Sequence, residues 1–151
     1  MKKRKKILLI LGVLLVAAAA GAFYIYKEYN RTHKDTAEQR PDYSVTASKL
    51  VKEFETAEQA SNKQYWDKII EVDGVVKDIA KDDRGFYSVV LGDTSSMSSV
   101  RCSMDSLHND EAAVLKKGNT ATLRGICTGF NADELLGSDV ILVRCALISK
   151  K

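Results

Sequence analysis

The feature that most restricts the fold of this chain is an apolar segment close to its start. Residues 7–26, ILLILGVLLVAAAAGAFYIY, hold no charged or strongly polar side chain and follow the basic sequence MKKRKK. A helix rises about 1.5 Å per residue, so a segment of this length matches a hydrocarbon core of about 30 Å. We therefore expect a transmembrane signal-anchor helix over 7–26. Positively charged segments that flank a membrane span stay on the cytoplasmic side. We therefore expect residues 1–6 to form a cytoplasmic end and residues 27–151 to lie outside the cytoplasm.

A cleaved signal peptide is the alternative interpretation of the same segment. It requires a basic region, a short apolar region and small residues at the cleavage site, and KKRKK, ILLILGVLLV and AAAAGA supply them. The apolar run continues through FYIY past that site, which favours the uncleaved anchor. Both interpretations place the remainder of the chain outside the cytoplasm, in the periplasm or at the cell exterior.

The charge of the chain is divided unevenly along its length. Residues 1–41 hold nine Lys and Arg against three Asp and Glu, a net +6, so residues 42–151 carry −3 of the total +3. Domains that bind nucleic acid are usually basic, because counterion release from phosphates drives their affinity. The acidic balance therefore argues against tight, nonspecific nucleic-acid binding. Polar residues 27–44 are expected to be a linker, which leaves 45–151 as one folded domain.

The folded part begins with a helical pattern. Thr46 or Ser48 can cap a helix through its hydroxyl group. Apolar residues then recur at three- and four-residue spacing, which predicts one buried stripe on an amphipathic helix. The stripe consists of Leu50, Val51, Phe54, Ala57 and Ala60.

From residue 67 onward the apolar period changes to two, which is typical of strands. Three strands, a helix and two further strands follow in that order, which is the order of a five-stranded OB-fold barrel. We therefore predict an α+β, mainly β, OB-fold domain. The expected strands are 68–79, 86–92, 100–104, 119–129 and 138–149, with a helix at 105–118.

Several of these segments resemble the tRNA-anti-like family of bacterial OB-fold proteins. The likeness lies in VDGVV, YSVVLG, VRCSM, KKGNTATLRGICTG and VILVRCALI, preceded by VTASKLVKEFETAEQASNKQYWDKII, and it covers about residues 44–149. It implies a five-stranded barrel and, by analogy with anticodon-binding domains, nucleic-acid binding. It implies no catalytic residue.

Three cysteines lie in the expected strands. Cys127 and Cys145 fall on neighbouring antiparallel strands whose connection would centre on residue 136, and both are expected to point inward. Facing Cβ atoms lie roughly 4.5–5.5 Å apart, near disulfide reach. We expect a Cys127–Cys145 disulfide, which an oxidising exterior would favour. A pair that includes Cys102, or three buried thiols, are the alternatives.

The expected ligand-binding face follows from the way OB barrels bind on their second and third strands. Alternation directs five side chains to the outer face, and we name them the candidate face: Phe86, Ser88, Val90, Arg101 and Ser103. One aromatic ring and one arginine make a thin platform, whereas single-strand binders use several aromatics along a basic groove.

No pattern in the sequence indicates catalysis, a cofactor or a metal site. His33 lies in the linker, His108 begins the expected helix, and the cysteines form no C-x-x-C pair. Metal sites need such ligands in clusters, and nucleophilic catalysis needs a base beside the nucleophile. We therefore predict a binding module without enzymatic activity. Its ligand would be a protein, a glycan or a small molecule, with single-stranded nucleic acid as the alternative.

Overall fold

The computed structural model describes residues 12, 15–26, 35–133 and 135–150, and the chain divides into two units, Met1–Lys34 and Asp35–Lys151. In the first unit, residues 15–26 are helical and their side chains are exposed. Within the described ranges, no helix combines the length and apolar character that crossing a membrane requires. The expected cytoplasmic end 1–6 and the start of the expected span lie outside the described residues.

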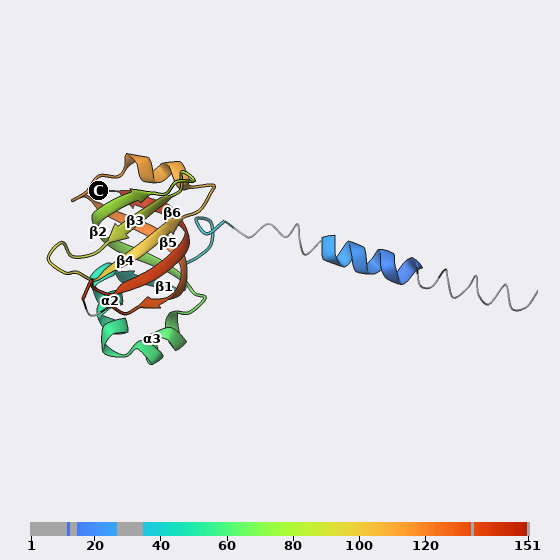
Figure 1. The fold of residues 1–151 in the computed structure, drawn as a ribbon, viewed down its shortest axis with the longest axis horizontal. Helices are drawn as coiled ribbons and strands as arrows, with labels where there is room; N and C mark the ends of the chain where they lie inside the picture. The colour runs from blue at the N-terminus through green and yellow to red at the C-terminus, as the bar shows by residue number, and fades with distance from the viewer. Residues whose placement is uncertain (1–11, 13–14, 27–34, 134, 151) are drawn as a thin grey trace, which may run out of the picture. The chain divides into compact units, whose positions relative to one another are not determined.

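The second unit is a closed barrel with one added strand (Figure 1). Five strands follow the order β2-β3-β4-β6-β5, and β2 pairs with β5 to close the ring. The pairing of β4 with β6 is parallel, and the other pairings in the ring are antiparallel. This confirms the predicted five-stranded barrel. The short strand β1 (Tyr43–Thr46), which the sequence analysis did not predict, pairs in parallel with β2. The barrel strands are β2 (Ile69–Lys81), β3 (Tyr87–Leu91), β4 (Ser99–Met104), β5 (Thr120–Asn131) and β6 (Asp139–Lys150).

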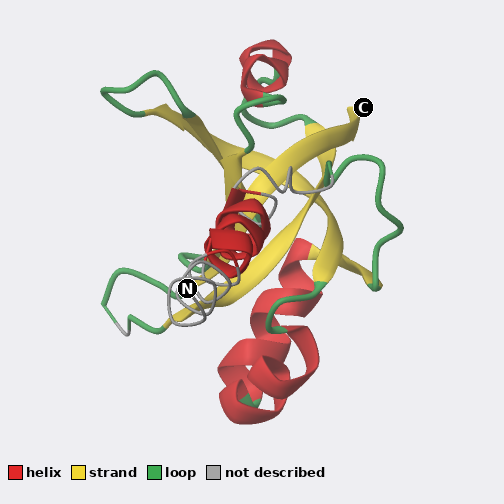
Figure 2. Cartoon of the chain, turned by 90° about the vertical axis from the view of Figure 1, so that its right-hand side faces the viewer, coloured by secondary structure: helices red, strands yellow, loops and turns green. Residues whose placement is uncertain are grey.

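Two helices, α2 (Ala47–Thr56) and α3 (Glu58–Tyr65), lie at one end of the barrel (Figure 2). Thr46 caps α2, because its hydroxyl accepts the Lys49 backbone N–H at 3.4 Å. Leu50, Val51 and Phe54 are buried as predicted. The predicted extension of the stripe to Ala57 and Ala60 is wrong, since α2 ends at Thr56 and both alanines are exposed.

The predicted helix at 105–118 is also wrong in extent. The structure holds a short three-ten helix, η1 (Asn109–Val114), and the chain is extended again at Leu115. The Asp105 carboxylate accepts the Leu107 backbone N–H at 3.0 Å. Such a local side-chain bond competes with helical hydrogen bonding, so the first part of the segment forms a turn.

The folded unit begins at Asp35, within the segment that was expected to be a linker. Residues 35–42, which we name the strap, are held against the barrel by long-range hydrogen bonds. Arg124 Nη1 donates to the carbonyl oxygens of Ala37 and Gln39 at 2.8 and 2.7 Å, and Asp42 Oδ2 accepts the Ile69 backbone N–H at 2.9 Å. The compact unit thus spans Asp35–Lys151 and includes part of the segment that was expected to be a linker.

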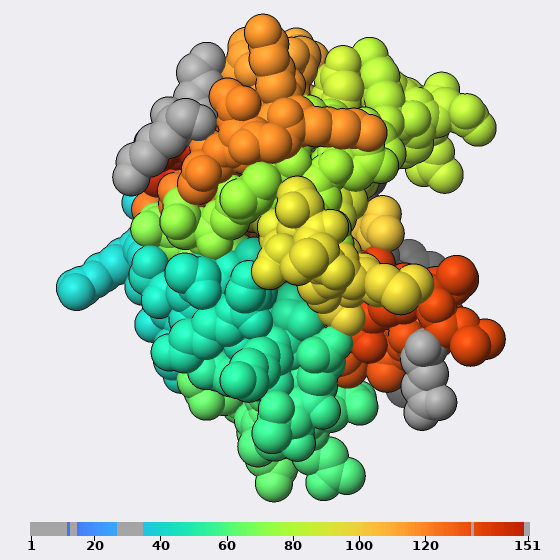
Figure 3. Space-filling model, turned by 90° about the vertical axis from the view of Figure 1, so that its left-hand side faces the viewer, coloured from blue at the N-terminus to red at the C-terminus, as the bar shows by residue number. Residues whose placement is uncertain are grey.

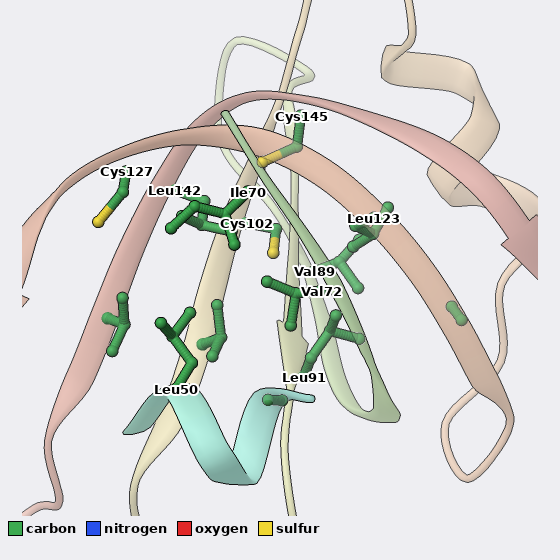
Figure 4. Close-up of a cluster of buried hydrophobic side chains, with 14 of the residues drawn as sticks. Leu50, Ile70, Val72, Val89, Leu91, Cys102, Leu123, Cys127, Leu142 and Cys145 are labelled. Carbon is green, nitrogen blue, oxygen red and sulfur yellow. The ribbon is translucent and has the colours of Figure 1, made fainter. Parts of the chain in front are cut away.

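The three cysteines are buried free thiols within the core. The two cysteines that were expected to form a disulfide do not face each other, because the strand register places Cys127 opposite Leu142. The register between β5 and β6 shifts near Arg144, whose φ is 54°. This irregularity directs the Cys145 side chain over Gly125. Figure 4 shows Cys127 apart from Cys102 and Cys145 in the core.

Candidate ligand-binding face

The candidate face lies on β3 and β4, where the strand register places its residues side by side. Ser88 pairs with Ser103, and Val90 pairs with Arg101, so these four side chains share one face of the sheet. Phe86 precedes β3 and its side chain is 43% exposed. The face is not uniformly open, because Val90 is only 7% exposed whereas Arg101 is exposed.

The arginine of the candidate face is held by an acid on a neighbouring strand. Arg101 Nη2 lies 2.9 Å from Asp139 Oδ2, and its Nε lies 3.3 Å from the same oxygen. Ser99 donates its hydroxyl to the other carboxylate oxygen of Asp139 at 2.5 Å. The cation is therefore already paired and oriented by the protein itself.

A second ion pair lies beside the first on the same face. Asp78 pairs with Val90 in the sheet register, and Lys117 Nζ lies 2.5 Å from Asp78 Oδ1. The hydrogen bond from Lys117 lowers the pKa of the Asp78 carboxyl, so this acid stays ionised. With both cations paired, the face presents mixed charge and does not form a basic groove.

Two loops next to the start of β4 expose large apolar side chains. They are residues 92–98 and 132–138, which we name the loop pair, and Figure 3 shows them in contact, in yellow and red-orange. Met97, Leu135 and Leu136 are 65%, 84% and 77% exposed. Neither loop belongs to the candidate face that was expected from the sequence.

The loop pair is held in place by bonds to several elements. Ser98 accepts the Ser138 backbone N–H at 3.1 Å and donates its hydroxyl to Glu55 of α2 at 2.6 Å. Lys77 of β2 donates to the carbonyl oxygens of Ser96 and Ser98 at 2.7 and 3.1 Å. Apolar side chains are thus presented to solvent on a braced backbone, which favours a role in recognition.

A separate groove of about 390 Å³ lies between α2 and α3. Its lining includes Lys49, Lys52 and Gln64, and it contains no residue of β3 or β4. Beneath it, Tyr65 donates its hydroxyl to Glu53 at 2.5 Å, and burial raises the pKa of Tyr65. This groove is distinct from the candidate face.

His108 uses both ring nitrogens within the protein. Its Nδ1 lies 2.8 Å from Glu111 Oε1, and its Nε2 lies 2.8 Å from Asp35 Oδ1. Burial lowers the pKa of His108, but the hydrogen bonds to the two carboxylates outweigh burial and raise it. The imidazole joins the strap to η1, so its geometry indicates a structural role. Across the described part of the chain, no three His, Cys, Asp or Glu side chains form a group that could hold a metal ion. His33 lies outside that part.

A closed five-stranded barrel with a helical turn between its third and fourth strands defines an OB-fold, and its face on β3 and β4 is where such barrels bind ligands. More specifically, the chain belongs to the tRNA_anti-like family, whose model matches residues 1–147. This finding confirms the family resemblance noted in the sequence.

One solved structure shows the same fold at low sequence identity, and two more are similar to parts of it. A candidate nucleic acid-binding lipoprotein from Klebsiella pneumoniae subsp. pneumoniae is 18% identical, with 69% of this chain and 91% of that chain covered and a TM-score of 0.53. A candidate aspartyl-tRNA synthetase from Leishmania major is 10% identical, with 89% and 26% covered and a TM-score of 0.46. An OBody bound to hen egg-white lysozyme is 15% identical, with 58% and 88% covered and a TM-score of 0.42. A search of curated proteins found no match.

Proposed function

We propose that this protein is a membrane-anchored, extracytoplasmic OB-fold module that binds a protein partner without catalysis. Two observations together carry the proposal. The cations of the candidate face are already paired with acids of the protein itself. Beside the face, the braced loop pair exposes Met97, Leu135 and Leu136. Apolar side chains on a fixed backbone bind with little loss of conformational entropy. Paired charges around them fit a protein surface better than a polyphosphate backbone.

The location rests on the N-terminal sequence. The uncharged run at 7–26 has the length of a membrane span and follows five cations, which favours a cytoplasmic N-terminus. Protease treatment of spheroplasts, in which the outer side of the cytoplasmic membrane is accessible, and of lysed spheroplasts tests this. We expect the folded unit to be digested before lysis, and the mass of the undigested protein to include residues 1–26. Protection until lysis would contradict the topology, and loss of residues 1–26 would establish a cleaved signal peptide.

The binding face is tested with a photo-reactive amino acid in the full-length chain. We expect a discrete cross-linked adduct from position 88 on β3, and none of that size from the exposed position Gln59 on α3. Adding Leu136→Asp should remove the adduct at position 88, because it places a charge on the apolar surface of the loop pair. Leu107→Asp is the matched control, since Leu107 is also 77% exposed but lies before η1. Equal loss with both substitutions, or no adduct at position 88, would refute the proposal.

Single-stranded nucleic acid is the second candidate ligand. It is favoured by the family, by the name of the lipoprotein from Klebsiella pneumoniae and by the exposed Phe86 and Arg101 on the candidate face. Fluorescence anisotropy with labelled single-stranded RNA and DNA at physiological salt separates the two candidates. Saturable binding that Arg101→Glu abolishes would support this ligand over a protein partner. Absence of binding would exclude it.

A further inference from the structure

The core holds two thiols on neighbouring strands, Cys102 on β4 and Cys145 on β6. β4 and β6 pair in parallel, with Cys102 opposite Leu142 and Met104 opposite Cys145. Met104 is the register partner of Cys145, and Cys102 is the preceding residue of β4 whose side chain points into the barrel. Cys102 and Cys145 are both completely buried, and Figure 4 shows them next to each other in the cluster. Cys127 lies on β5, which pairs with β6 on the side away from β4, and its sulfur is directed away from both.

Two local features bring the Cys145 side chain to this place. The register between β4 and β6 shifts between Cys102 and Met104. The register between β5 and β6 shifts between Arg124 and Ile126, the two residues that flank Gly125. Cys145 Sγ occupies the space that a side chain at position 125 would need, so the glycine leaves room for it. Residues one step apart across a strand pair lie roughly 7–8 Å apart at Cα, close to the upper limit for a disulfide. The two side chains point toward each other across this gap, because the Cys145 thiol is hydrogen-bonded to Cys102.

We propose that Cys102 and Cys145, and not Cys127, are the cysteines that oxidise to a disulfide, which would join β4 to β6. In this step the two thiols lose two protons and two electrons and form one S–S bond. The electrons pass to a disulfide, either of a thiol oxidoreductase or of a small molecule, which is reduced to two thiols. The proposal is independent of what the candidate face binds.

The timing of oxidation follows from the burial of the pair. The thiolate is the reacting form, and burial together with the hydrogen bond to Cys102 raises the pKa of Cys145. In the closed barrel both sulfurs are also buried, out of reach of an oxidant. The bond forms while the chain folds, before β5 and β6 close the barrel. Once formed, it is shielded from reductants by the same burial.

The test is to unfold and reduce the full-length chain in detergent and to refold it in a buffer of reduced and oxidised glutathione. Digestion with trypsin after blocking free thiols then reports the pairing, because cleavage after the arginines and lysines places each cysteine on its own peptide: 102–116, 125–144 and 145–150. We expect peptides 102–116 and 145–150 to be joined, with a mass lower than their sum by two hydrogens. Peptide 125–144 should carry one blocked thiol.

Matched variants separate this result from misfolding. Cys127→Ser should still form the bond, and Cys102→Ser should not. The oxidised Cys127→Ser chain should unfold at a temperature roughly 10 °C above its reduced form, because the bond restricts the unfolded chain. A join between peptides 125–144 and 145–150, or three blocked thiols in chains that refold with native circular dichroism, would overturn the proposal.

Discussion

Arg124 offers the sharpest test of how the strap is held to the barrel. Its side chain is only 13% exposed, and it donates to Glu71 Oε2 through Nε at 3.2 Å and Nη2 at 2.6 Å. The same guanidinium donates to the carbonyl oxygens of Ala37 and Gln39 in the strap. One cation therefore links β5, β2 and the strap, and the substitution Arg124→Met removes all of these bonds while it keeps an unbranched apolar stem.

The expected loss follows from what the substitution leaves behind. Glu71 is 22% exposed and would lose its partner, and leaving a mostly buried charge unpaired costs about 3–5 kcal/mol. The remaining exposure of Glu71 to water lowers that cost. The carbonyl groups of the strap can bind water if residues 35–42 detach, so the loss of their hydrogen bonds adds little to the free-energy cost. We expect Arg124→Met to lower the free energy of unfolding by about 3 kcal/mol.

Urea unfolding followed by circular dichroism measures this loss, with Arg101→Met as the control. Arg101 is 44% exposed and pairs with Asp139 at the surface, so its loss should cost no more than about 1 kcal/mol. Hydrogen exchange in Arg124→Met should accelerate in residues 35–42 before it does in the barrel strands. Equal destabilisation by both variants, or unchanged exchange in the strap, would refute the assignment of Arg124 as the residue that fixes the strap.

Three further predictions concern other buried sites. Gly125→Ala should destabilise the protein by about 1–3 kcal/mol, because its Cβ would collide with Cys145 Sγ, and adding Cys145→Ala should recover part of this loss in urea unfolding. Thr36→Val should stabilise the protein by about 1 kcal/mol in the same assay, because the buried Thr36 hydroxyl has no hydrogen-bond partner among the residues that the structure describes; a loss of stability would contradict this. The pKa of His108 is raised by its hydrogen bonds to Glu111 and Asp35, which outweigh burial, so its contribution to stability is complete below about pH 6.5 and is lost as pH rises through the raised value. Thermal unfolding from pH 5 to 9 should show this loss in the native chain but not in His108→Gln.

The barrel could be predicted from the sequence because its signals are local. Two-residue alternation marks each strand, and the stripe of Leu50, Val51 and Phe54 marks α2. The strap could not be predicted, because its backbone is irregular and is fixed by Arg124 and His108, which lie far along the chain. No local pattern reports such bonds.

The register of the strands that carry Cys127 and Cys145 could not be predicted for a related physical reason. The prediction centred the connection between the two strands on residue 136, which would place Cys127 opposite Cys145. The ladder instead starts with Asn131 opposite Asp139 and shifts between Gly129 and Cys127, so Cys127 lies opposite Leu142. A further shift between Ile126 and Arg124 leaves Cys145 beside Gly125, where it pairs with Met104 of β4.

Alternation placed four residues of the candidate face on one side of the sheet because the β3 and β4 ladder is regular, with Ser88 against Ser103 and Val90 against Arg101. It did not show that Val90 is only 7% exposed.

The paired charges on the candidate face also restrict how a nucleic acid could bind there. A phosphate that contacts Arg101 must compete with Asp139, which lies 2.9 Å from the guanidinium, and a phosphate near Lys117 must compete with Asp78. Each neutralised phosphate contributes about −0.7 to the slope of log affinity against log salt for single strands. With both cations already paired, the slope should be near zero. Substituting Asp139→Asn and Asp78→Asn would free both cations, and binding to single-stranded RNA should then gain a slope of about −1.4. A steep slope in the native chain would show that the ion pairs open at little cost, and the argument for a protein partner would lose its electrostatic support.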